Sequence, residues 1–179
     1  MIGQQRQARA ALFALVAMLA SVAARAHSAS DAYLTLTEVA HDAPNDPGVI
    51  HAQWDIALRD LDFVLKLDDN GDGNIVWGEL RKHQSAIAVY AYRYLKFSGD
   101  TTACQVKPTG QMVDGHADGA YVSLMFDVVC SGAPKRLSLD YSLFFAIDPS
   151  HRAILIAQNG ADISTALLSS DKAHLELPL

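Results

Sequence analysis

A segment of twelve residues, 68–79, places oxygen-bearing side chains at fixed offsets around a central glycine. Its pattern matches the calcium-binding loop of an EF-hand: Asp at loop position 1, Asp or Asn at positions 3 and 5, Gly at 6 and Glu at 12. Calcium prefers roughly six to eight oxygen ligands, and a short loop supplies them by wrapping around the ion. The segment therefore predicts two helices joined by a metal-binding loop, with these ligands: Asp68, Asn70, Asp72, Asn74 and Glu79.

The predicted ligands have different roles. The first three would offer side-chain oxygens, Asn74 its backbone carbonyl, and Glu79 both carboxylate oxygens. Gly73 permits the sharp turn because it lacks a Cβ. Ile75 is the apolar residue expected to tie the loop to a core, and Val76 has no oxygen, so a water molecule would take its place. The alternative is a solvated turn without metal, since Asp, Asn and Gly also favour turns.

The first 26 residues have the pattern of a secretory signal peptide. Arginines precede an apolar stretch from Ala10 to Ala24, and Ala24-Arg25-Ala26 forms an A-x-A cleavage site. That stretch is shorter than the roughly 20 residues needed to span a bilayer, and no later segment is apolar for long enough. We expect a mature chain without a membrane span, beginning at His27, in the periplasm or secreted. An uncleaved N-terminal anchor is the alternative.

Charge narrows the classes of partner. Removing the three arginines of the leader from 14 basic residues leaves 11 against 20 acidic residues, a formal charge of −9. The sequence lacks a basic patch with interleaved aromatic residues, which argues against nucleic acid as a partner. An acidic surface attracts cations in general.

The two cysteines, Cys104 and Cys130, fit an oxidising compartment. They are the only pair, so a disulfide between them has no competing connectivity. Their spacing is not that of a redox C-x-x-C motif. We expect a structural disulfide, which the loop-entropy model values at about 3.5 kcal/mol. Two buried free thiols are the alternative.

Alternating apolar and polar residues predict a mainly β fold. Residues 27–179 are enough for a single domain. Several short strand patterns are separated by turn signals, which favours an antiparallel β-sandwich. The predicted strands cover residues 33–37, 50–58, 122–130, 137–143, 153–157 and 174–177.

The EF-hand is expected as an insertion into this sandwich, at about residues 60–96. A short helix with Phe63, Val64 and Leu67 on one face would precede the calcium loop, and a longer helix over residues 79–95 would follow it. One turn after Glu79, where EF-hands usually carry apolar residues, stand His83 and Gln84. This departure favours a hand fixed against the sheet over one that opens a groove.

Four stretches together resemble a known family, the periplasmic N-terminal region of some bacterial HupE/UreJ-type membrane proteins. They are residues 30–34, residues 54–61, the calcium loop ending in Trp77-Gly78-Glu79, and residues 143–152. The resemblance implies an exported domain placed beside membrane helices. Those proteins continue into membrane segments, which these 179 residues do not contain, so their transport function is not carried over.

Two other constellations suggest chemistry less strongly. His27 at a mature N-terminus could chelate copper, but no His-x-His or His-x3-His pair supports it. Residues 148–152 hold an acid, a hydroxyl and an imidazole, yet Asp-Pro-Ser is ordinary turn chemistry. No sequence motif assembles a nucleophile, a base and oxyanion donors, so we do not expect an enzyme.

These patterns together favour an exported calcium-binding domain in which Ca²⁺ has a structural role. The alternative function is an accessory or sensor domain for a membrane metal transporter, in which case a membrane protein would be its partner.

Overall fold

The computed structural model describes residues 30–38, 49–132 and 134–179. The predicted signal peptide and His27 lie outside these residues. The described elements, in chain order, are β1 (Asp31–Glu38), β2 (Val49–Ala57), α2 (Leu58–Leu65), α3 (Trp77–Ala91), the 3-10 helix η1 (Tyr92–Tyr94), β3 (Leu95–Gly99), β4 (Thr102–Ala103), β5 (Gln105–His116), β6 (Gly119–Val129), β7 (Arg136–Tyr141), β8 (Arg152–Asn159), β9 (Asp162–Leu168) and β10 (His174–Pro178).

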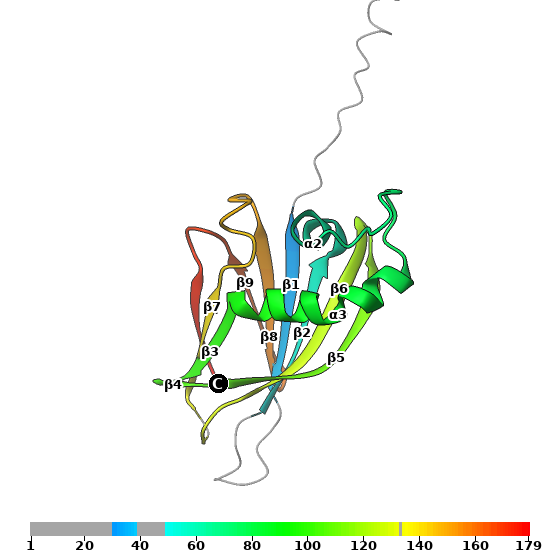
Figure 1. Ribbon diagram of the computed structural model, residues 1–179. Helices are drawn as coiled ribbons and strands as arrows, with labels where there is room; N and C mark the ends of the chain where they lie inside the picture. Colours follow the sequence, from blue (N-terminus) through cyan, green and yellow to red (C-terminus); the bar gives the residue numbers. More distant parts are fainter. Residues whose placement is uncertain (1–29, 39–48, 133) are drawn as a thin grey trace, which may run out of the picture.

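The strands form two sheets (Figure 1). The larger has the order β5-β6-β2-β1-β8-β9 and the smaller the order β10-β7-β3-β4. The expectation of a mainly β, antiparallel fold is confirmed in part, since the two sheets are mostly antiparallel. One pair departs from it, because β1 and β8 run parallel. Their first residues lie side by side, with the amide of Arg152 donating to the Ser30 carbonyl at 3.0 Å, so both strands leave the same end of the sheet.

Apolar side chains of both sheets form one hydrophobic cluster. Alternate residues of β6, from Val122 to Val128, are almost fully buried, as the period of two predicts. The ring of Phe126 contacts Tyr92 at a centroid distance of 5.5 Å and Phe97 at 6.1 Å. Because Phe97 belongs to β3, this contact joins the larger sheet to the smaller one.

The helices lie between β2 and β3 in the chain, as the sequence predicts. Figure 1 shows α3 crossing the strands of the larger sheet. Its residues Leu80, Ile87 and Ala91 belong to the hydrophobic cluster, so α3 is fixed against the sheets. One prediction is wrong: Phe63 of α2 is 67% exposed, because the helix packs through Leu58 and Leu61.

Several boundaries differ from the predicted ones. The second strand ends at Ala57, because Leu58 already begins α2. Leu143 lies in a turn after β7, although it is fully buried. Among the residues described, none of the helices combines the length and apolar character that crossing a bilayer requires.

Candidate metal centre

A helix end positions the start of the candidate loop. The helix α2 ends at Leu65, and Lys66 takes the left-handed conformation with φ 53°. Asp62 then redirects the chain: its Oδ1 accepts the backbone N–H groups of Leu67 at 2.7 Å and of Asp68 at 3.0 Å. Leu67 is fully buried, which anchors this side of the loop in the core. Asp68 therefore starts the loop from a fixed position.

Asp68 organises the first half of the loop. Its carboxylate accepts the backbone N–H groups of Gly71 at 2.8 Å, Asp72 at 3.3 Å and Gly73 at 2.8 Å. These bonds require the chain to fold back over the carboxylate. Gly71 and Gly73 make the turn possible with φ values of 71° and 82°, a region that L side chains rarely adopt.

Asn70, Asp72 and Asn74 continue the same arrangement. The Asn70 side-chain oxygen accepts the N–H of Asp72 at 2.8 Å, and Asp72 Oδ1 accepts the N–H of Asn74 at 2.8 Å. All three residues are exposed. Ile75 follows as the first partly buried residue and packs against the core cluster, the position expected for it.

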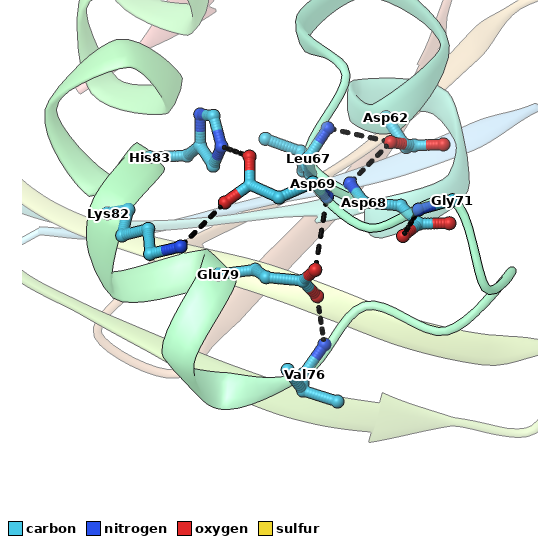
Figure 2. A network of polar contacts seen from close by, with 9 residues as sticks. All are labelled: Asp62, Leu67, Asp68, Asp69, Gly71, Val76, Glu79, Lys82 and His83. Carbon is cyan, nitrogen blue, oxygen red and sulfur yellow. Dashed lines mark hydrogen bonds and ion pairs between the residues drawn. The ribbon is translucent and has the colours of Figure 1, made fainter.

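Glu79 connects the two ends of the loop (Figure 2). Its Oε1 accepts the N–H of Asp69 at 3.0 Å, and its Oε2 accepts the N–H of Val76 at 2.9 Å. Val76 is the N-cap residue of α3, so a glutamate at the third helical position reaches back to an otherwise free helix amide. Glu79 is only 5% exposed, although its neighbours Trp77 and Gly78 are exposed.

A second set of charges holds the loop against α3. Figure 2 shows the Asp69 carboxylate directed at two residues of α3, Lys82 and His83. The distances are 2.9 Å from Lys82 Nζ and 2.8 Å from His83 Nε2. Hydrogen bonds from His83 and then Lys82 lower the pKa of Asp69. The polar residue at 83, unusual for an EF-hand, thus has a partner inside the loop.

The donor set suits a hard cation. Asp68, Asn70, Asp72 and Glu79 offer oxygen only, which is the ligand type that calcium prefers. Among the described residues, however, no group of three His, Cys, Asp or Glu side chains converges as a metal site. The loop oxygens accept backbone N–H groups instead. Asp68 Oδ2, Asp72 Oδ1 and both Glu79 oxygens each accept one backbone N–H. A carboxylate oxygen has two lone pairs, so these four oxygens can still ligate a cation.

A hollow gives solvent access to the loop. It has a volume of about 430 Å³ and lies between the loop and the hairpin of β5 and β6. Asp62, Asp68 and Asp118 line it together with Arg59. Three carboxylates against one guanidinium make this approach favourable for a cation.

The predicted disulfide is present and joins Cys104, just before β5, to Cys130, just after β6. Sequence reasoning missed Asp62, Asp69 and Lys82, which support the loop without belonging to the ligand pattern. The sequence offers two signals for these supporting residues. Asp62 lies six residues before Asp68, and the positive charge of Lys82 lies one turn after Glu79.

The candidate triad near residue 150 does not assemble. The Ser150 hydroxyl donates to Asp148 within a turn. The His151 ring forms its hydrogen bonds with other residues. Instead, His151 is fully buried between Ser30, with 2.7 Å from its Oγ to Nδ1, and Tyr141, with 2.8 Å from its Oη to Nε2. Burial lowers the pKa of His151 to about 4, so the imidazole is neutral at pH 7.

The hydrogen bonds around His151 have one consistent direction. The Ser30 hydroxyl donates to Asp60 Oδ2 at 2.9 Å, so its oxygen is free to accept from Nδ1–H of His151. The Tyr141 hydroxyl then donates to Nε2. These hydrogen bonds link the residue before β1 to α2 and β7, which is a structural role.

Comparison with known proteins adds no assignment. No protein-family model matches the chain, and a search of curated proteins found no match. The resemblance to HupE/UreJ-type proteins therefore stays a prediction.

Proposed function

We propose that residues 68–79 bind one calcium ion, and that the ion holds α2 and α3 in place within an exported domain. The observation that carries the proposal is the position of Glu79. This carboxylate is buried at the start of α3 yet reaches the second residue of the loop. An ion bound by Asp68 and Glu79 would join the end of α2 to the start of α3.

The charges of the loop support calcium as the ligand. Asp68, Asp72 and Glu79 would place three carboxylates around a doubly charged ion. Like charges repel, so a doubly charged ion bound among these carboxylates would reduce their mutual repulsion. Extracellular calcium modules bind at roughly 10⁻⁴–10⁻³ M, and we expect an affinity in that range or tighter.

A structural role fits the surroundings of the loop better than a switch. A calcium switch exposes an apolar groove when its helices open. Here Leu67 and Ile87 are fully buried in the core shared with the sheets. Opening the helices would expose this core, so calcium is better placed to stabilise the closed arrangement. The disulfide accords with an oxidising, extracytoplasmic compartment.

Calorimetric titration of the purified protein with Ca²⁺ tests the proposal. Wild type should bind one ion, and Glu79→Gln should bind at least about tenfold more weakly, because a bidentate carboxylate is lost. Glutamine can still accept the Val76 N–H, so the start of α3 is retained. The control Glu176→Gln removes the same charge from the exposed strand β10 and should leave binding unchanged. Absence of binding in wild type would sink the proposal.

A second candidate function is an accessory or sensor domain for a membrane metal transporter. An apolar surface beside the loop favours it: Trp77 is 56% exposed, Met112 48% and Val113 38%, and the three line one shallow hollow. On this proposal a membrane protein would co-purify with the domain in calcium and dissociate in a chelator. Met112→Ser, which lies outside residues 68–79, should weaken that association without changing calcium affinity.

A further inference from the structure

The sheets of the described chain end in four edge strands, and three of them carry features that discourage pairing with another strand. The strand β4 has only 2 residues. The strand β10 has 5 residues and includes Glu176 and Pro178. The strand β5 is longer, but Lys107 and Pro108 precede a register shift at Gly110. Short length, charge, proline and bulges are the usual protections of exposed edges.

The fourth edge strand, β9, has only one of these protections, a charge at its first residue, Asp162. It runs for 7 residues, Asp162–Leu168, without proline, lysine or a bulge, and among the described strands it pairs only with β8. Its alternate residues Ile163 and Leu167 are 66% and 50% exposed. The strand therefore presents both free backbone groups and apolar side chains to a partner strand.

We propose that β9 pairs antiparallel with β9 of a second copy of this chain, which makes the protein a dimer through a continuous sheet. A two-fold axis through Thr165 places Thr165 opposite its own copy and Ile163 opposite Leu167 of the other copy. Each of these side chains points to the same face as Ile154 and Ile156 of β8, since Leu167 pairs with Ile154 and Thr165 with Ile156. The dimer contact thus extends an aliphatic row already present.

Charge makes a second copy a suitable occupant. The chain is acidic overall, with a formal charge of −6, so two copies repel one another where acidic surfaces meet. The only charged residue of β9 is Asp162. In the proposed register Asp162 lies opposite Leu168, and the two copies of Asp162 stand six positions apart, about 20 Å. That separation exceeds the screening length of about 8 Å at physiological salt.

Cysteine cross-linking tests the register. Opposed residues of an antiparallel pair have Cα atoms about 4.5 or 5.5 Å apart, which is within disulfide range. Thr165→Cys should therefore form an intermolecular disulfide when oxidised glutathione accepts the electrons of the two thiols. Ile163→Cys is the matched control, because its two copies would stand about 13 Å apart. The native cysteines are paired, so each variant adds one thiol to the described chain. Faster cross-linking of Ile163→Cys than of Thr165→Cys would overturn the proposal.

Sedimentation equilibrium tests the dimer itself. Wild type should show a monomer–dimer equilibrium, and Thr165→Lys should weaken it by about tenfold or more, because two lysines would face each other on the axis. Thr102→Lys on the exposed edge β4 is the control and should dimerise as wild type does. A monomeric wild type, or a dimer unaffected by Thr165→Lys, contradicts the proposal. Because these measurements need no calcium, their outcome is independent of the metal-binding proposal.

Discussion

The two-sheet core and the loop at residues 68–79 are held by different forces. In the core, apolar side chains of both sheets bury one another, and Phe126 is 1% exposed. In the loop, residues 70–74 are all exposed, and the chain follows its path because Asp68 and Glu79 accept backbone N–H groups. Burial of apolar surface sustains the first region, while carboxylates sustain the second.

The difference implies that the two regions respond to different changes. Removing apolar volume should lower stability equally with and without calcium. Removing a loop carboxylate should matter little for the core but should abolish what calcium adds. The predictions below test the core and the loop in turn.

The largest effect is expected in the core. Phe126→Ala removes a ring that touches Phe97 of the smaller sheet, and it should lower the free energy of unfolding by about 3–5 kcal/mol. Phe63→Ala is the matched control, since that ring is 67% exposed, and it should cost little. Urea unfolding followed by circular dichroism measures both. An equal loss of unfolding free energy in the two variants would contradict a buried position for Phe126 between the two sheets.

The disulfide should contribute nearly as much. Replacing Cys104 and Cys130 together by alanine frees a loop with a sequence separation of 26 and should cost about 3.5 kcal/mol by the loop-entropy model. The loss should be the same in calcium and in chelator, because the bridge packs in the hydrophobic cluster and not in the loop. A loss seen only in chelator would mean that the bridge and the loop act as one unit.

Because burial lowers the pKa of His151, we expect the protein to lose stability in acid. The burial that lowers its pKa to about 4, against 6.5 for a free imidazole, makes the unfolded chain bind the proton more readily. Its stabilising contribution is complete above about pH 6.5 and falls as the pH drops towards 4, by about 3 kcal/mol in all. Burial raises the pKa of Asp60, which opposes part of this loss. Unfolding measured across that range should depend on pH less steeply in His151→Gln than in wild type, and equal slopes would refute this role.

The smallest effect is expected at the start of the loop. Asp62→Ala leaves the N–H groups of Leu67 and Asp68 without their acceptor and should cost about 1 kcal/mol. Asp62→Asn retains an accepting oxygen and should recover most of it. The alanine variant should also bind calcium more weakly, because Asp68 is then less fixed. Calorimetric titration of both variants with Ca²⁺ checks this. A calcium affinity of Asp62→Ala equal to that of wild type would show that Asp62 does not support the site.

Much of the fold follows from local patterns, and the remainder depends on distant contacts. The strands β1, β2 and β6 show clear alternation, and each was predicted within a few residues. The strand β5 was missed because Pro108 and two glycines interrupt its pattern, and its pairing with β6 overrides that composition. The parallel pair of β1 and β8 cannot be read from either strand alone, since their direction depends on where the chain returns.

The candidate site divides in the same way. The spacing of Asp68, Asp72 and Glu79 is a local signal and predicts the loop directly. The roles of Asp62 and of the contact between Asp69 and His83 depend on how α2 and α3 pack. Those contacts become visible only when the helices are placed against the sheets.

Calcium dependence of stability in wild type and Glu79→Gln tests the central claim most directly. Urea unfolding would be followed for both proteins in calcium and in chelator. At calcium about 100-fold above its dissociation constant, wild type should gain about 2.7 kcal/mol, and Glu79→Gln should gain almost nothing at the same concentration. Coincident curves for wild type in calcium and in chelator, or an equal gain in the variant, would contradict a calcium ion that holds the two helices in place.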